Sequence, residues 1–148
     1  MLTQILISAA LILSTVVVHA ISLELIMKAF LAVRTELEVR WRALAFALVV
    51  LAVFTAHVIE IWIWAIFYYL EASVSEIPTL EAALYFSTSS FTTVGFGDLV
   101  LSEEWRLLSS FEATNGMILF GWSTAFIFEI VRHTYSHLLR DSGGYLSR

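Results

Sequence analysis

Residues 92–98 read Thr-Thr-Val-Gly-Phe-Gly-Asp, a spacing that suits the coordination of a dehydrated cation. Glycine adopts positive φ at little steric cost, so Gly95 and Gly97 permit a backbone that alternates between conformations normally forbidden to side chains. Such a backbone turns successive carbonyl oxygens toward one side, where they can replace the water shell of a cation. The hydroxyl of Thr93 can add one more oxygen. The expected cation ligands are Thr93, Val94, Gly95 and Phe96.

The elements around this segment are apolar enough to lie in a membrane. Of the 148 residues, 59% are hydrophobic and 14% are charged, whereas soluble domains are about 45–50% apolar and about 25% charged. A bilayer core of about 30 Å needs about 20 apolar residues of helix. Three runs are long enough, namely Leu2 to Phe30, Ala43 to Leu70 and Leu107 to Val131. We therefore predict an all-α membrane protein with three transmembrane helices.

Composition also excludes several classes of protein. The chain has no cysteine, which rules out disulfides and thiolate metal sites. It shows no basic nucleic-acid patch, no soluble ligand domain and no set of residues for an enzyme nucleophile and base. We expect no enzymatic activity, no resident cofactor and no nucleic-acid partner. The first run lacks a positive leading region and is too long for a signal peptide.

The charges predict the orientation in the membrane. Seven of the eight basic residues would lie on one side, which the positive-inside rule makes cytoplasmic. With three spans, the N-terminus is then outside and the C-terminus in the cytoplasm. The seven residues are Lys28, Arg34, Arg40, Arg42, Arg132, Arg140 and Arg148.

The segment between the second and third runs is too short to span. Pro78 and Thr79 form a helix-start signal, and Glu81 lies favourably in the first turn. A helix over 79–91 would be about 20 Å long, enough to enter the membrane but not to cross it. The return through 92–98 must then be buried in protein or line a watery path, because lipid leaves exposed backbone unsatisfied. A re-entrant pore helix followed by an extended filter is therefore expected.

The segment resembles the filter of the potassium-channel superfamily, whose pattern is TVGYG where this chain has TVGFG and then Asp98. The resemblance covers about residues 43–135 and points to the bacterial group with a two-helix pore. It implies a channel that conducts K⁺ selectively. The expected assembly is a homotetramer in contact with lipid in the bacterial inner membrane. The expected organisation is an extra N-terminal helix at 1–33, a cytoplasmic loop at 34–42, the pore domain at 43–135 and a cytoplasmic tail at 136–148. Within the pore domain the outer helix is 43–70 and the inner helix is 107–135.

The same resemblance assigns support for the filter to Thr92, Asp98, Tyr85 and Ser89. It implies a hydrogen bond from the Tyr85 hydroxyl to Asp98, although Tyr85 is also compatible with ordinary packing behind the filter. Small pH-gated relatives carry a glutamate where this chain has Ser89, which cannot share a proton with Asp98. Filter inactivation is therefore expected to differ from that of these relatives. The side chains of Val94 and Phe96 are expected to pack outward, away from the ion path.

The resemblance also implies an inner-helix gate. Gly116 matches a hinge glycine, with close helix packing as an equal alternative, and packing is favoured for Gly121. A ring of Phe128 side chains can close the inner mouth by dewetting, or Phe128 packs between helices. Glu129 beside it can attract cations. The expected pore-lining residues are Met117, Phe120, Thr124 and Phe128.

Ionisable residues inside the membrane are functional candidates by default. His19, His57 and Glu60 can form one cluster that joins the extra helix to the pore helices. A satisfied structural network is favoured for this cluster over a pH-sensitive gate element. Glu112 is expected to bond the pore helix near Ser89 or Ser90.

Two further histidines, His133 and His137, lie four apart near the end of the last run. Two ligands are too few for a metal site, so protonation at the gate or a solvated helix end is expected. No span carries regularly spaced arginines, so a charged voltage sensor is not predicted. The stimulus is left open among protons, lipid, membrane tension, voltage acting on ions in the filter and an unseen partner. Alternative functions are a non-conducting regulatory subunit and a less selective monovalent cation channel.

Overall fold

A computed structural model describes the chain except for residues 34–38, 72–73, 75 and 144–148. Four helices form within the described residues. They are α1 (Leu2–Val33), α2 (Val39–Leu70), α3 (Leu80–Phe91) and α4 (Arg106–Gly143). Three of them are long and apolar enough to cross a membrane, over Leu2–Ala32, Arg40–Leu70 and Arg106–Arg132. The chain is therefore an all-α membrane protein, as its composition predicts.

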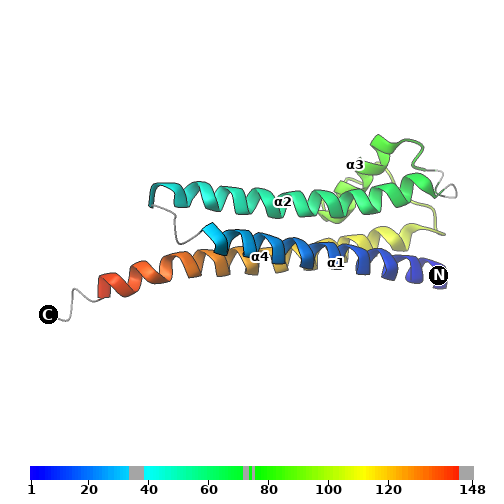
Figure 1. Cartoon of the computed structure of the whole chain (residues 1–148). Helices are drawn as coiled ribbons and strands as arrows, with labels where there is room; N and C mark the ends of the chain where they lie inside the picture. The colour runs from blue at the N-terminus through cyan, green and yellow to red at the C-terminus, as the bar shows by residue number, and fades with distance from the viewer. Residues whose placement is uncertain (34–38, 72–73, 75, 144–148) are drawn as a thin grey trace.

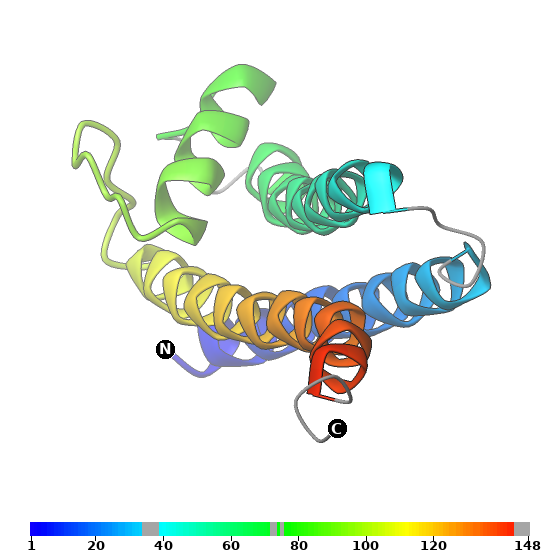
Figure 2. The same ribbon diagram turned by 90° about the vertical axis from the view of Figure 1, so that its left-hand side faces the viewer.

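The three long helices run alongside one another, and the short α3 lies at one end of the bundle (Figure 1). That end also carries Met1, the last turn of α2 and the first turn of α4. Helix α1 packs against both α2 and α4, and α3 packs against the same two helices. Viewed along the bundle, α2 and α3 lie on one side and α1 and α4 on the other (Figure 2).

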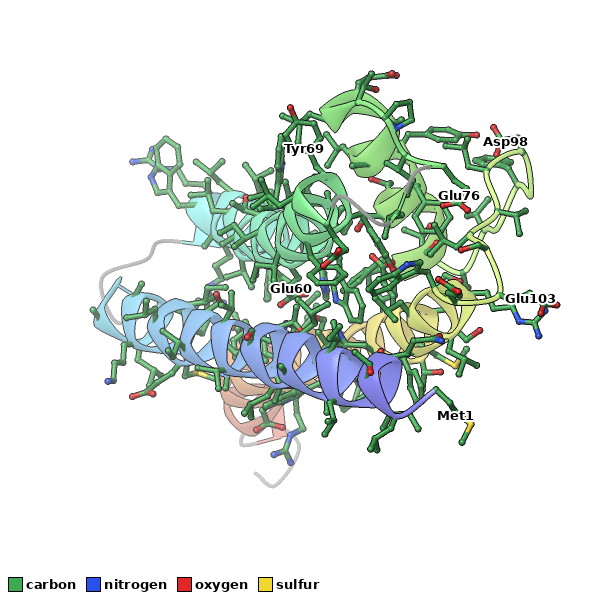
Figure 3. All side chains as sticks on the ribbon, turned by 90° about the vertical axis from the view of Figure 1, so that its right-hand side faces the viewer. Met1, Glu60, Tyr69, Glu76, Asp98 and Glu103 are labelled. Atoms are coloured by element: carbon green, nitrogen blue, oxygen red, sulfur yellow. The ribbon has the colours of Figure 1, made fainter. Side chains whose placement is uncertain are left out.

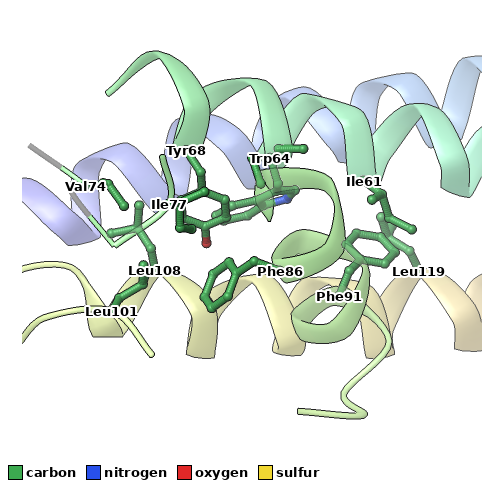
Figure 4. Close-up of a cluster of buried hydrophobic side chains, with 12 residues drawn as sticks. Ile61, Trp64, Tyr68, Val74, Ile77, Phe86, Phe91, Leu101, Leu108 and Leu119 are labelled. Carbon is green, nitrogen blue, oxygen red and sulfur yellow. The ribbon is translucent and has the colours of Figure 1, made fainter. Parts of the chain in front are cut away.

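The largest buried cluster lies where α2, α3 and α4 meet (Figure 4). Trp64 and Tyr68 of α2 are fully buried against Phe86 and Phe91 of α3. The rings of Tyr68 and Phe86 meet edge to face with centroids 5.1 Å apart, a favourable geometry for aromatic pairs. This cluster fixes α3 against the long helices and so positions the loop that follows it.

Helix α3 begins where the sequence signal places it. The Thr79 side chain accepts a hydrogen bond from the backbone N–H of Ala82 at 3.1 Å, which caps the helix. Glu81 lies in the first turn, where the helix dipole favours an acid. Twelve residues make a helix of about 18 Å, too short to cross a bilayer core of about 30 Å.

The buried face of α1 is polar along its first half. Gln4, Ser8, Thr15 and His19 are all buried there, one or two helical turns apart. The Gln4 side chain accepts from the backbone N–H of Leu107 at 3.2 Å. The Asn115 side chain donates to the Thr15 hydroxyl at 2.8 Å. Hydrogen bonds of this kind join helices in lipid, where apolar burial gives little driving force.

Two helix limits differ from expectation. Helix α2 begins at Val39, so residues 39–42 are helical rather than part of a loop. Helix α4 continues to Gly143, so residues 136–143 are helical rather than tail. The physical reason is that no proline or glycine interrupts the chain between Gly121 and Gly143, so nothing stops the helix where the apolar run ends.

Candidate functional site

The loop between α3 and α4 carries the Thr-Val-Gly-Phe-Gly segment in an alternating backbone. The φ angles of Thr93, Gly95 and Gly97 are 61°, 55° and 77°. Positive φ at the two glycines matches the expectation from their spacing. Thr93 was not expected there, since a β-branched residue rarely adopts positive φ. Every second residue of the segment therefore lies in the left-handed region.

Ser89 of α3 holds the middle of this loop with two bonds. Its backbone carbonyl accepts from the N–H of Gly95 at 3.2 Å. Its hydroxyl oxygen accepts from the N–H of Phe96 at 3.3 Å. Thr92 ends α3, and its hydroxyl donates to the carbonyl of Thr88 at 2.7 Å. The resemblance drew attention to Ser89, because small pH-gated channels carry a glutamate at this position. The two bonds show that the serine contacts the backbone of the loop.

Tyr85 of α3 meets Asp98, the residue that follows the Gly-Phe-Gly segment. The Tyr85 hydroxyl donates to the Asp98 carboxylate at 2.8 Å, the contact that the resemblance implies. This bond lowers the pKa of Asp98 and raises the pKa of Tyr85 from their ordinary values. The Tyr85 ring also stacks on Phe96, with centroids 6.1 Å apart and planes 7° apart. Tyr85 therefore contacts the loop at two places.

The loop is uncovered on its other side within one chain. The side chains of Val94 and Phe96 are 57% and 68% exposed. A Cβ atom built on Gly95 or Gly97 would meet nothing within 4 Å. A cavity of about 170 Å³ lies between the loop and α3, lined in part by Ser89 and Gly97. Within a single chain, the apolar side chains of Val94 and Phe96 are therefore largely exposed.

Glu112 of α4 links that helix to α2 and α3 behind the loop. Its carboxyl group lies 2.9 Å from the hydroxyl of Tyr68 on α2 and 2.5 Å from the hydroxyl of Ser87 on α3. The expected bond to the helix over 79–91 is therefore present, but it is made by Ser87 rather than at Ser89 or Ser90. The reason is helix phase, because Ser87 faces the α2–α4 side, where its hydroxyl also donates to the Ile61 carbonyl at 2.9 Å.

One face of α4 is left exposed by the other helices. Met117, Thr124 and Phe128 lie on it, as expected for a lining face. Phe120 does not, since it is half-buried with its ring 4.6 Å from His57 and 5.6 Å from Phe91. Gly121, which follows Phe120, lies on the exposed face. Because one residue turns a helix by about 100°, Phe120 points away from that face. The exposed residues on this side of α4 include Met117, Gly121, Thr124 and Phe128, together with Thr114, Ile118, Trp122 and Ala125.

Comparison with known families identifies the chain. A family model described as an ion channel matches residues 54–133, more than half of the sequence. The chain belongs to this ion channel family. Searches of curated proteins and of solved structures gave no match. The matched region of the ion channel runs from the middle of α2 into α4 and leaves α1 outside.

The ion channel also brings three ionisable residues from α1 and α2 together in its buried interior. Glu60 of α2 contacts His19 of α1 and His57 of α2, each at 2.8 Å. The sequence predicted this cluster from its position in the two runs. Ser123 of α4 completes it and was missed, because a serine in an apolar run carries no signal of its own.

The remaining candidates lie toward the other end of α4. The carboxylate of Glu129 accepts two bonds from the Arg132 guanidinium, at 2.7 and 2.9 Å. This pairing offsets the charge that was expected to attract cations. His133 and His137 lie outside the described side chains.

Proposed function

We propose that this ion channel is potassium-selective and that residues 93–97 form its filter. The observation that carries the proposal is the positive φ at Thr93, Gly95 and Gly97 within a TVGFG segment. A potassium filter uses four such loops, whose carbonyl oxygens replace the hydration shell of the ion. The permeant K⁺ is then held by Thr93, Val94, Gly95 and Phe96.

A fourfold assembly of identical chains accounts for the exposed surfaces. One chain supplies one loop, and four are needed to surround an ion. The exposed side chains of Val94 and Phe96 would be covered by the neighbouring copies. In this assembly α3 is the re-entrant pore helix, and its C-terminal end directs the negative end of its dipole toward the ion.

The exposed face of α4 supports a role as the inner helix. Met117, Thr124 and Phe128 would line the path below the filter, with Phe128 at the inner mouth. The basic residues then place the C-terminus in the cytoplasm and the N-terminus outside, in a bacterial inner membrane. Helix α1 would lie on the lipid side of the pore pair, since it packs on both helices.

Reconstitution in liposomes tests the proposal. The chain should give a current whose reversal potential follows the K⁺ gradient when Na⁺ replaces K⁺ on one side. Gly95→Ala should abolish that current, because a side chain at φ 55° is strained. Ser14→Ala is the control, since Ser14 is exposed on α1, outside the proposed pore.

The same recording separates the alternatives. A reversal potential near zero under a K⁺/Na⁺ gradient would make the protein a less selective cation channel. An assembled protein with no current at any voltage or pH would instead be a regulatory subunit. Chemical cross-linking in the membrane should give a largest species of four chains, and any other number contradicts the fourfold assembly.

A further inference from the structure

The buried cluster in the middle of the bundle has the donor set of a metal site. The Nδ1 atoms of His19 and His57 lie 2.8 Å from the two separate oxygens of the Glu60 carboxylate. The exposed fractions of these residues are 0%, 6% and 0%. Their ligand atoms all lie within 4.8 Å of one another. Figure 3 shows Glu60 on α2 directed toward α1.

The other nitrogen of each imidazole contacts one shared oxygen. The Nε2 atoms of His57 and His19 lie 2.9 and 3.3 Å from the hydroxyl oxygen of Ser123. The two rings are therefore held alike, with Nδ1 toward the carboxylate and Nε2 toward Ser123. Two imidazoles on different helices are oriented by the same pair of residues.

The four side chains of the cluster have one proton too few to complete their four hydrogen bonds. With Glu60 ionised and both imidazoles neutral, each Nδ1–H donates to the carboxylate and each Nε2 is a bare acceptor. Ser123 has one hydroxyl proton and can serve one of the two Nε2 atoms. The other would face an oxygen lone pair inside a buried cluster, where unmade bonds are costly.

We propose that His19, His57 and Glu60 bind a divalent transition-metal ion, with Zn²⁺ as the fitting ion. The metal would take both Nδ1 atoms and the carboxylate, a two-histidine, one-carboxylate set familiar for zinc, with a water completing the tetrahedron. Each imidazole then keeps an Nε2–H, and both donate to the two lone pairs of Ser123. Metal-bound histidines almost always donate their second ring nitrogen in this way.

The surroundings suit such an ion. The Trp122 ring lies 5.2 Å from the His19 ring, and the Phe120 ring lies 4.6 Å from the His57 ring. Apolar rings beside a metal site limit the access of solvent to its ligands. The ion would link α1, which lies outside the matched family region, to α2 within it.

Metal content tests the site directly. The full chain, purified in detergent without a histidine tag, is exchanged against a chelator, loaded with Zn²⁺ and washed. Elemental analysis should find about one Zn²⁺ per chain. A His133→Gln/His137→Gln double variant is the background control and should keep that ion, because it leaves the three ligands intact. Glu60→Gln and His19→Gln should lose it.

A second measurement covers ligand variants that fail to fold. Co²⁺ loaded into the unmodified chain should give the visible absorption bands of a tetrahedral site, which Zn²⁺ then bleaches. Ser123→Ala keeps all three ligands and removes only the shared acceptor. It should weaken Zn²⁺ binding about 10–100-fold, the usual effect of losing a partner of a metal-bound histidine.

The proposal is wrong if the His133→Gln/His137→Gln variant binds no Zn²⁺ and Co²⁺ gives no tetrahedral spectrum with the unmodified chain. The cluster would then be a hydrogen-bonded ring closed by one extra shared proton. Neither readout requires a current, so this test stands apart from that of potassium selectivity.

Discussion

A Cβ atom on Gly116 would lie 2.0 Å from the carbonyl oxygen of Phe91, far inside any possible contact distance. The backbone of α4 therefore touches the last turn of α3, one residue before the loop begins. The sequence left hinge and close packing as equal alternatives for Gly116, and the structure shows a close contact with Phe91 at this position. Close approach to α3 requires glycine at this position, whether or not α4 also bends there.

Gly116→Ala should destabilise the channel, because the methyl group meets backbone rather than a movable side chain. Overpacking of this kind typically costs about 1–3 kcal/mol. The thermal unfolding midpoint in detergent should fall. Gly121→Ala is the paired control, and it should leave the midpoint unchanged or higher, since alanine favours a helix by about 1 kcal/mol. Equal midpoints for the two variants would argue against the contact.

Glu112→Gln should be tolerated, whereas Glu112→Ala should not. The amide of glutamine can accept from Tyr68 and donate to Ser87, whose own proton then goes to the Ile61 carbonyl. Alanine leaves the buried Tyr68 hydroxyl without its acceptor, at a cost of about 1–3 kcal/mol. Chemical unfolding in detergent measures both. A glutamine variant as unstable as the alanine variant would show that the negative charge itself is needed.

Ser89→Ala should loosen the loop between α3 and α4 without unfolding the helices. The N–H of Phe96 loses its acceptor, while the N–H of Gly95 keeps the backbone carbonyl of residue 89. The expected loss is about 1 kcal/mol, the usual net value of one hydrogen bond. Hydrogen–deuterium exchange should speed up at Phe96. Ser90→Ala keeps the carbonyl that accepts from Thr93 and should leave this exchange unchanged.

The hydrogen bond between Tyr85 and Asp98 contributes to stability only over a limited range of pH. The pKa of Asp98 is lowered, so its contribution is present above the ordinary carboxyl value of about 3.9 and is lost as the pH falls through the lower folded value. The pKa of Tyr85 is raised, so its contribution is present below about 10 and is lost as the pH rises through the higher folded value. The bond is therefore intact across the neutral range.

Tyr85→Phe removes this bond and should return the pKa of Asp98 toward its ordinary value. If conduction needs ionised Asp98, the acid midpoint of the current should move to higher pH than in the unmodified channel. Tyr69→Phe, a change at an exposed tyrosine of α2, is the control. An acid midpoint that does not move in Tyr85→Phe would show that the bond does not hold the charge of Asp98.

Several features of the ion channel follow from local sequence. Run length and composition predict the three long helices, and Pro78-Thr79 predicts the start of α3 to within one residue. The spacing of Gly95 and Gly97 predicts their positive φ. Each of these depends on interactions within a few residues, on helix caps, glycine sterics or the thickness of a bilayer, and so it can be predicted without knowing the neighbours.

Other features were decided only by how the helices meet. Ser87 rather than Ser89 contacts Glu112, Phe120 turns toward His57, and Ser123 joins two imidazoles from far along the chain. A sequence shows the period of a helix but not its rotation against a neighbour. One residue turns a helix by about 100°, so the rotation of the helix decides which of two neighbouring residues is exposed and which is packed. The contacts between helices set that rotation.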